Sequence, residues 1–292
     1  EDLVVSAESI TQAAWEGSTP KLTSFHTSST QVDGNTGNYY YNVYAADPAS
    51  NASASVQFGI AYANLDGSGS VNFNPLVDGV GASRVIYGQY RTLVLGDENS
   101  QFVFGNYTGS YFHVISVERS VYKEKIFTGF NLTLSGSGGQ VDLTDNSGDV
   151  SSITFNDAGR VYQVVSGSNG SAYSGDGYTT NSGSYGLFLP DIGTILLNTQ
   201  ALSGSIAGAI DMQVSQSSNS LGLNPQYLFD VMNGGGNFTM RSEETLTSDF
   251  VFVRARNSEF NYTENPSYIS GSTGEIIYPI LVDSPQTFIS SV

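Results

Sequence analysis

Residues 130–165 read FNLTLSGSGGQVDLTDNSGDVSSITFNDAGRVYQVV, and this stretch decides the fold class. Short runs of alternating apolar and polar side chains are separated by Gly-rich turns at residues 135–139, 145–148 and 156–159. Alternation with a period of two is typical of a β-strand with one buried face. The Asn, Asp and Gly of the last turn tolerate the positive φ that a tight hairpin needs. The stretch therefore predicts several short antiparallel strands in succession.

The alternating pattern continues on both sides of this stretch. YYYNVYAADP at residues 39–48 and ASVQFGIAYANLDGSGSVNF at residues 54–73 both alternate, and the second has a Gly-rich turn at residues 66–69. SYGLFLPDIGTILL at residues 184–197 is almost wholly apolar on either side of Pro190. Continuous apolar runs of this length predict two buried strands, broken at the proline.

Helical signals are few. Residues 82–96 place apolar side chains at helical spacing, which predicts one buried face made by Val85, Ile86, Tyr90, Leu93 and Val94. Residues 224–236 predict a second helix, in which Asn224 caps the start, Pro225 occupies the first position and three glycines end it. Residues 11–15 are expected to add another turn or two of helix near the start of the chain.

These patterns together predict an all-β protein, mainly of antiparallel sheets in sandwich-like modules, with a few short helices. We expect an N-terminal segment at residues 1–20, a β domain at 21–108 and a second β domain at 109–292. Residues 166–184 contain almost no large apolar side chains and are expected to form a long loop.

The composition restricts the classes of partner. The 292 residues include 10 Lys and Arg against 27 Asp and Glu, so the net charge is −17. A field of that sign repels phosphate backbones and anionic membranes, and we expect neither as a partner. Only 13 % of residues are charged, about half the usual share, which suits a protein outside the cytoplasm or one buried against neighbours in an assembly.

The sequence also lacks the residues and segments that several kinds of site and cellular location require. The chain has no cysteine, which excludes disulfides, thiol nucleophiles and thiolate metal sites. No stretch reaches the ~18 apolar residues of a membrane span, and EDLVVSAESI does not resemble a signal peptide. The chain begins without Met and stops inside an alternating pattern, PQTFISSV, so we expect it to be a piece of a longer polypeptide.

No set of residues predicts a catalytic site or a cofactor. His26 and His113 are the only histidines, and structural roles are expected for both. The acidic residues that a glycoside hydrolase would need are present, but spacing does not nominate a pair; they include Glu118, Asp191, Glu243 and Glu244. Asp142, Asp145, Asn146 and Asp149 crowd oxygen ligands into one turn, but their spacing fits a calcium loop poorly, so turn chemistry is favoured. We therefore expect no metal ligands.

The segment VFVRARNSEFNYTENPSY at residues 251–268 is the best candidate for an interface. Alternation places Arg254 and Arg256 on the same face, in a chain with few basic residues. A guanidinium group pairs with a carboxylate in a bidentate fork, so this face would grip an acid of another subunit or, as the favoured reading, of the same chain. Candidate interface residues are Arg254, Arg256, Phe260 and Tyr262.

Several segments resemble a known family. ITQAAWEGSTPKLTSFHTSSTQ at residues 10–31, IYGQYRTLVL at 86–95, LFLPDIGTILLNTQAL at 187–202 and RNSEFNYTENPS at 256–267 are similar to virion structural proteins of large contractile-tailed phages of marine bacteria, cyanobacteria in particular. The resemblance runs from about residue 10 to residue 292, and YGQYR and RNSEFNYTENPS are its most specific pieces.

The resemblance implies a non-enzymatic subunit of the virion, outside the capsid interior. The tail or baseplate is the expected location and the neck the next. The partners would be other virion structural proteins and further copies of the chain in a symmetric assembly. Two alternatives remain: a receptor- or glycan-binding adhesin of the same tail, with residues 166–184 as its tip, and a tail-borne polysaccharide depolymerase. The depolymerase is less favoured because such enzymes carry long repetitive β-helical patterns, which this sequence lacks.

Overall fold

The stretch at residues 130–165 folds as a run of antiparallel strands in the computed structural model. β9 (Asn131–Gly136) and β10 (Gly139–Asp145) form a hairpin, and β10 also pairs with β12 (Gly159–Ser168). β11 (Thr154–Asn156) pairs with the start of β12, and only Asp157 and Ala158 separate the two. The predicted hairpins at 135–139 and 156–159 are confirmed.

The structure describes residues 3–28, 39–71, 73–74, 76, 81–136, 139–173, 180–205 and 223–251. Residues 9–245 form one compact unit, and the described residues outside it, 3–8 and 246–251, belong to a second unit. No helix in the described part of the chain is long and apolar enough to cross a membrane.

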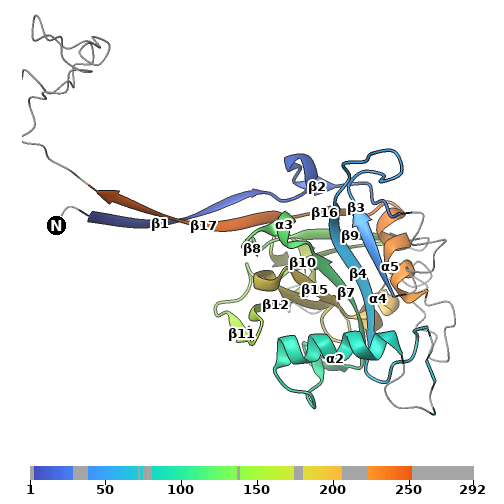
Figure 1. The fold of residues 1–292 in the computed structure, drawn as a ribbon. Coiled ribbons are helices and arrows are strands. Elements are labelled where there is room, and N and C mark those ends of the chain that lie inside the picture. The colour runs from blue at the N-terminus through green and yellow to red at the C-terminus, as the bar shows by residue number, and fades with distance from the viewer. Residues whose placement is uncertain are drawn as a thin grey trace, which may run out of the picture. The chain divides into compact units, whose positions relative to one another are not determined.

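Most strands of the described ranges belong to one large antiparallel sheet (Figure 1). Its neighbours run in the order β2-β16-β9-β10-β12-β14-β15-β7-β4-β3, and β11 and β13 (Ser171–Ala172) pair with β12. The remaining members are β2 (Lys21–Leu22), β3 (Tyr40–Tyr44), β4 (Val56–Asn64), β7 (Tyr111–Val117), β14 (Gly186–Leu189), β15 (Thr194–Leu197) and β16 (Asn237–Thr239). The all-β fold with few helices is confirmed.

Two smaller strand groups complete the described β structure. β5 (Phe102–Phe104) and β6 (Tyr107–Gly109) form a hairpin. β1 (Leu3–Ala13) and β17 (Arg241–Val251) are neighbours in a three-stranded sheet whose third strand is β8 (Lys125–Ile126).

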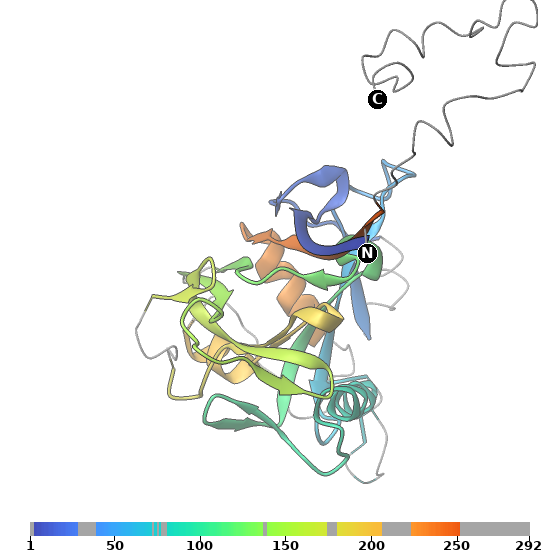
Figure 2. The same ribbon diagram turned by 90° about the vertical axis from the view of Figure 1, so that its left-hand side faces the viewer.

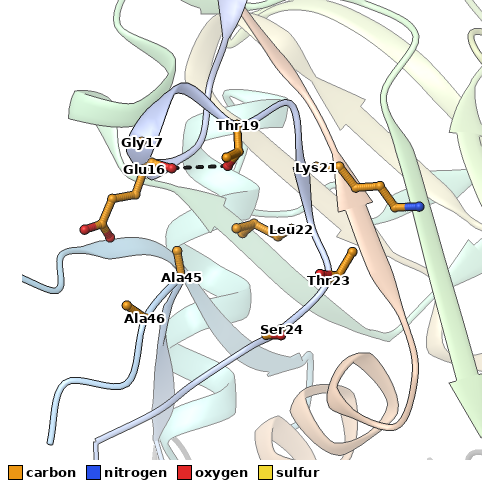
Figure 3. Close-up of a pocket in the computed structure, with 9 residues that line it drawn as sticks. All are labelled: Glu16, Gly17, Thr19, Lys21, Leu22, Thr23, Ser24, Ala45 and Ala46. Carbon is orange, nitrogen blue, oxygen red and sulfur yellow. Dashed lines mark hydrogen bonds between the residues drawn. The ribbon is translucent and has the colours of Figure 1, made fainter. Parts of the chain in front are cut away.

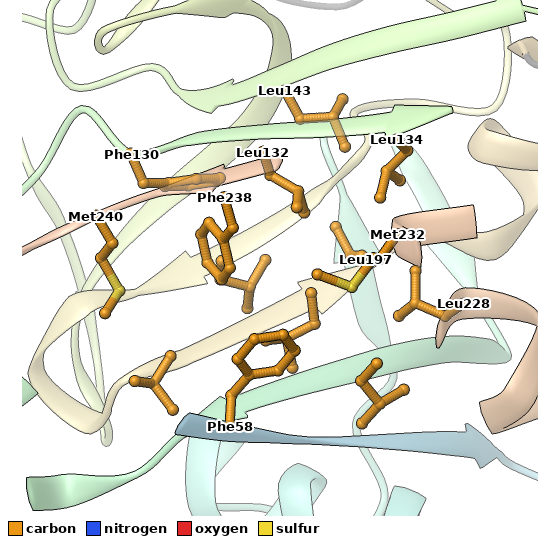
Figure 4. Close-up of a cluster of buried hydrophobic side chains, with 14 of the residues drawn as sticks. Phe58, Phe130, Leu132, Leu134, Leu143, Leu197, Leu228, Met232, Phe238 and Met240 are labelled. Carbon is orange, nitrogen blue, oxygen red and sulfur yellow. The ribbon is translucent and has the colours of Figure 1, made fainter. Parts of the chain in front are cut away.

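The middle of the large sheet is buried on both faces. Consecutive residues of a strand point to opposite faces, and in β7, β14 and β15 they belong to two different apolar clusters. Ile115, Phe188 and Ile195 join the larger cluster, part of which is shown in Figure 4, while their neighbours Val114 and Leu196 join the smaller one. Burial on both faces explains the continuous apolar runs in the sequence.

The helices cover the two faces. α5 (Asn224–Asn233) contributes Leu228 and Met232 to the larger cluster, and α2 (Ala82–Leu95) contributes Tyr87 and Val94 to the smaller one. The two helices therefore lie on opposite faces of the sheet, and Figure 2 shows α2 nearly end-on. The other helical segments are α3 (Arg119–Tyr122), α4 (Thr199–Ser205) and the short 3-10 turns η1 (Glu16–Ser18) and η3 (Pro190–Ile192).

Three helix predictions need correction. Residues 11–15 are not helical, because β1 continues to Ala13 and Trp15 forms a bridge with Thr19. The cap of α5 is Leu223, and Asn224 instead donates from Nδ2 to the carbonyl of Gly69 at 2.7 Å. The third correction concerns the face of α2, where Val85 and Leu93 are exposed and Tyr87 is buried.

The predicted subdivision also differs from the structure. β7 begins at residue 111 and pairs with β4, so the sheet runs across the expected boundary at residue 109. Part of the expected loop at 166–184 is strand, since β12 continues to Ser168 and turns at Asn169 and Gly170 into β13. Asn169 and Gly170 both have positive φ, which lets the two strands connect through two residues.

Candidate protein–protein interface

An apolar hollow of about 410 Å³ lies between α2 and β3, the last strand in the sheet order. We call it the α2–β3 hollow. Its lining consists of aromatic and aliphatic side chains with a single amide: Tyr39, Tyr40, Ala61, Ala82, Val85, Ile86, Gln89 and Tyr90. A concave apolar surface of this kind is typical of a place where another molecule binds.

The outer face of α2 carries large apolar side chains in solvent. Val85 is 64 % exposed and Leu93 is 46 % exposed. Gln89 lies between them and is also exposed. The three residues are four positions apart, so they lie on the same side of the helix, one turn after another. Tyr39 and Tyr40 extend the exposed aromatic surface beside them.

Tyr87 fixes α2 against the sheet. Its ring is buried and lies 5.6 Å from the ring of Phe102 and 5.3 Å from that of Phe112, centre to centre. Its hydroxyl donates to the carbonyl of Gly109 at 3.4 Å, and burial raises the pKa of that hydroxyl. Aromatic contacts of this kind stabilise beyond the area they bury. The buried side of α2 therefore packs against the sheet without using Val85 or Leu93.

The charges at the ends of α2 oppose its dipole. The first turn contains no acid but does contain Arg84, and the last turn contains no basic residue. Gly96 caps the C-terminal end, and the exposed Asp97 and Glu98 follow it. A helix carries partial positive charge at its N-terminus and partial negative charge at its C-terminus, so both ends repel the charges beside them. Acids of a partner placed beside the first turn would be favourable there, because that turn contains none of its own.

A second hollow, of about 320 Å³, lies beside η1 and β2 (Figure 3). Its two charged residues, Glu16 and Lys21, point in opposite directions in this view. The carboxylate of Glu16 accepts hydrogen bonds from the hydroxyl of Ser55 and the amide of Gln57, both at 3.4 Å. The hollow therefore brings no acid and base together.

His113 is held in a buried network that uses both ring nitrogens. Nε2 lies 2.8 Å from the carbonyl oxygen of Asn224, which only accepts, so Nε2 carries the proton. Nδ1 then accepts from the hydroxyl of Thr199 at 2.8 Å. Burial lowers the pKa of His113 to about 4, although the bond to Asn224 opposes this shift. Both nitrogens are occupied by the fold, which leaves neither for a substrate.

His26, the other histidine, has a backbone role. Its N–H donates to the carbonyl of Tyr44 at 3.0 Å, and the N–H of Tyr44 donates back at 2.8 Å. This pair of bonds connects the segment after β2 to the end of β3.

Three of the candidate catalytic carboxylates are engaged in ion pairs. Asp191 accepts from Nε and Nη2 of Arg160 at 3.0 and 2.7 Å, and from the Arg160 backbone N–H at 2.7 Å. Burial alone would raise the pKa of Asp191, but the bonds from Arg160 outweigh it and lower the pKa. Glu243 lies 3.7 Å from Lys125 and Glu244 lies 3.0 Å from Lys123.

Glu118, the fourth candidate, precedes α3 and makes no side-chain cap bond to it. Its backbone carbonyl accepts from the N–H groups of Val121 and Tyr122, so the residue has a clear structural part in the start of the helix. Asp191 and Glu243 share basic neighbours, because both interact with Lys125 and Arg160, so positive charge lies beside each of these two carboxylates.

The oxygens of the turn at residues 142–149 bind the chain itself. Asp145 accepts from the backbone N–H groups of Gly129, Phe130 and Ser147, and burial raises the pKa of its carboxyl against these bonds. Asp149 accepts from the N–H of Ala172, and Asn146 from that of Gln163. The described ranges contain no group of three or more acidic or His side chains arranged to hold a metal ion.

The interface residues predicted from the sequence, Arg254, Arg256, Phe260 and Tyr262, lie outside the described residues. The sequence pattern does not predict the α2–β3 hollow, because it places the exposed Val85 and Leu93 in the core. One feature of the sequence does indicate an exposed apolar surface. Apolar side chains occur around a larger part of α2 than a single buried face can cover.

Comparisons with protein-family models, with curated proteins and with solved structures give no match for this chain.

Proposed function

We propose that the chain is a non-enzymatic structural subunit of a tailed-phage virion that acts through protein–protein interfaces. The tail or baseplate region is its proposed location, and the neck is the next. The observation that carries the proposal is the α2–β3 hollow with the exposed Val85 and Leu93 beside it. The resemblance to virion structural proteins, described under the sequence analysis, is the basis for proposing that the chain belongs to a virion.

The surface composition supports an assembly role. Large apolar and Tyr side chains concentrate at the centres of interfaces, where charged residues are depleted. Only 13 % of the residues are charged, and exposed large aromatic side chains of the described part include Tyr39, Tyr40, Phe155 and Tyr173. A free protein with that surface would be prone to association, whereas a subunit covers it with its neighbours.

The occupied polar groups support the absence of catalysis. The imidazole of His113 and the carboxylates of Asp145 and Asp191 are bound within the fold. A catalytic acid or base needs to reach a substrate proton, and these groups already hold internal partners.

Mass spectrometry and immunogold labelling of purified particles test the proposal. We expect the chain in the particles in a fixed number of copies, with gold at the distal tail. Gold at the neck would support the structural role but place the chain in the neck instead of the distal tail. Particles that contain none of the chain would overturn the proposal.

An adhesin of the same tail is the second candidate, favoured by one observation. Tyr173, just after β13, is 67 % exposed within the expected tip at residues 166–184. Exposed Tyr rings stack on sugars, so a glycan array would detect binding that Tyr173→Ala removes. Equal binding by wild type and Tyr173→Ala would exclude this tip.

A further inference from the structure

We propose that α2 packs antiparallel against α2 of a second copy of this chain, across a two-fold axis that passes through Gln89. The proposal deepens the assembly role, on whose interface it rests, by naming the partner. A two-fold interface uses the same patch on both copies, so the patch must be complementary to itself. The outer face of α2 meets this requirement in its spacing, its shape and its charges.

The spacing of the exposed residues is symmetric about Gln89. Val85 lies four residues before it and Leu93 four residues after it, on the same side of the helix. A two-fold rotation through Gln89 therefore places Val85 of one copy opposite Leu93 of the second copy, and the reverse. The two Gln89 amides meet on the axis, where one can donate to the other.

The α2–β3 hollow supplies a place for the incoming side chain. Val85 forms part of its wall, together with Ile86 and Tyr90. Since Leu93 of the second copy faces Val85, that leucine enters the hollow and the exposed Tyr39 covers it. Each copy provides one such side chain and one hollow, so the contact closes after two copies.

The charges favour the antiparallel direction. Antiparallel pairing brings the first turn of one helix, which contains no acid, close to Asp97 and Glu98 of the second copy. The partial charges of the two helix ends are also opposite in this arrangement. Parallel pairing would bring like ends of the two helix dipoles together.

The size of the surface predicts a weak contact. Fourteen residues make a helix about 21 Å long, whereas a stable dimer buries about 800 Å² on each partner. We therefore expect purified chains to be mainly monomeric when dilute and to pair at high concentration. In an assembly, neighbouring contacts would hold the copies together and raise the effective concentration.

Single cysteines test this arrangement directly, because the chain has none of its own. Purified Gln89→Cys is treated with a short bismaleimide at high protein concentration. Phe155→Cys, whose side chain is 67 % exposed on β11, is the control for random collisions. We expect Gln89→Cys to form crosslinked dimer at least ten times faster than Phe155→Cys.

The direction of packing has its own test. Val85→Cys mixed with Leu93→Cys is expected to crosslink much faster than Val85→Cys alone, since two Val85 positions lie about 12 Å apart along antiparallel helices. Faster reaction of Val85→Cys with itself would overturn the antiparallel arrangement. Gln89→Cys reacting no faster than Phe155→Cys would overturn the pairing.

These results are separate from the test of the virion role. The crosslinking uses only the purified chain, so a negative result would refute the helix pairing alone. The proposed place of the chain in the virion would still be tested by mass spectrometry of the particles. Leu93→Asp gives a second readout, with unchanged thermal unfolding as the sign that it folds. We expect it to lower the sedimentation-derived association constant at least tenfold; an unchanged constant would overturn the proposal.

Discussion

Acid should weaken the fold through His113. The imidazole is fully buried, and its pKa is lowered to about 4 from an ordinary value of 6.5. Between these values the unfolded chain binds a proton that the folded chain does not. The free energy of unfolding therefore falls as pH decreases from about 6.5 to about 4.

The size of the effect follows from the two pKa values. Each pKa unit corresponds to about 1.4 kcal/mol, so the complete loss is about 3 kcal/mol and about 2 kcal/mol of it is reached at pH 5. This loss is a large part of the free energy of unfolding of a typical domain, which is roughly 5–15 kcal/mol.

The assay is urea unfolding at pH 7 and pH 5, followed by fluorescence of Trp15, the single and buried tryptophan. Both chains carry His26→Gln, so that His113 is the only histidine in one of them and His113→Gln removes it from the other. Carboxylates titrate alike in both chains and cancel in the comparison. Subtracting the loss in the His113→Gln chain should leave about 2 kcal/mol for His113. Equal losses in both chains would show that the network does not hold the imidazole neutral.

Two further predictions concern packing and ion pairing. Gly193→Ala should destabilise the fold by at least about 2 kcal/mol, because φ is +65° there and the new Cβ would overlap the ring of Tyr122. Gly88→Ala, in open space on α2, should instead stabilise by about 0.5–1 kcal/mol, and thermal unfolding of both variants checks the contrast. A double-mutant cycle with Arg160→Met and Asp191→Asn should give a coupling of about 1 kcal/mol, reduced by partial exposure, and a coupling of zero would contradict the bidentate geometry.

Local patterns in the sequence predicted the fold where neighbouring residues decide the structure. The turn at Asp157 and Ala158, the break at Pro190 and the end of α5 at Gly234 all depend on backbone preferences of a few residues. The turn at Asn169 and Gly170 carried the same kind of signal, but the low apolar content of the surrounding segment obscured it.

The remaining features depend on contacts between distant residues, which one sequence does not contain. Asn224 has the chemistry of a helix cap, but the carbonyl of Gly69 lies close enough to bind its amide. Val85 and Leu93 fit a buried face by spacing, but the rings around Tyr87 decide which side of α2 is covered. The candidate interface therefore depends on which side of α2 is buried, and residues distant in the sequence decide that.

The position of Trp15 has a consequence for the order in which the chain folds during synthesis. Its indole N–H donates to the carbonyl of Phe238 across 223 residues, and β2 pairs with β16 beside it. β2 must wait for β16, which is synthesised long after it, and contacts of such long range make folding slow. Until residue 240 has emerged, β2 and the larger apolar cluster remain incomplete and can associate with other nascent chains. A ribosome stalled before Phe238 should therefore hold a protease-sensitive chain, even with most of the sheet already made.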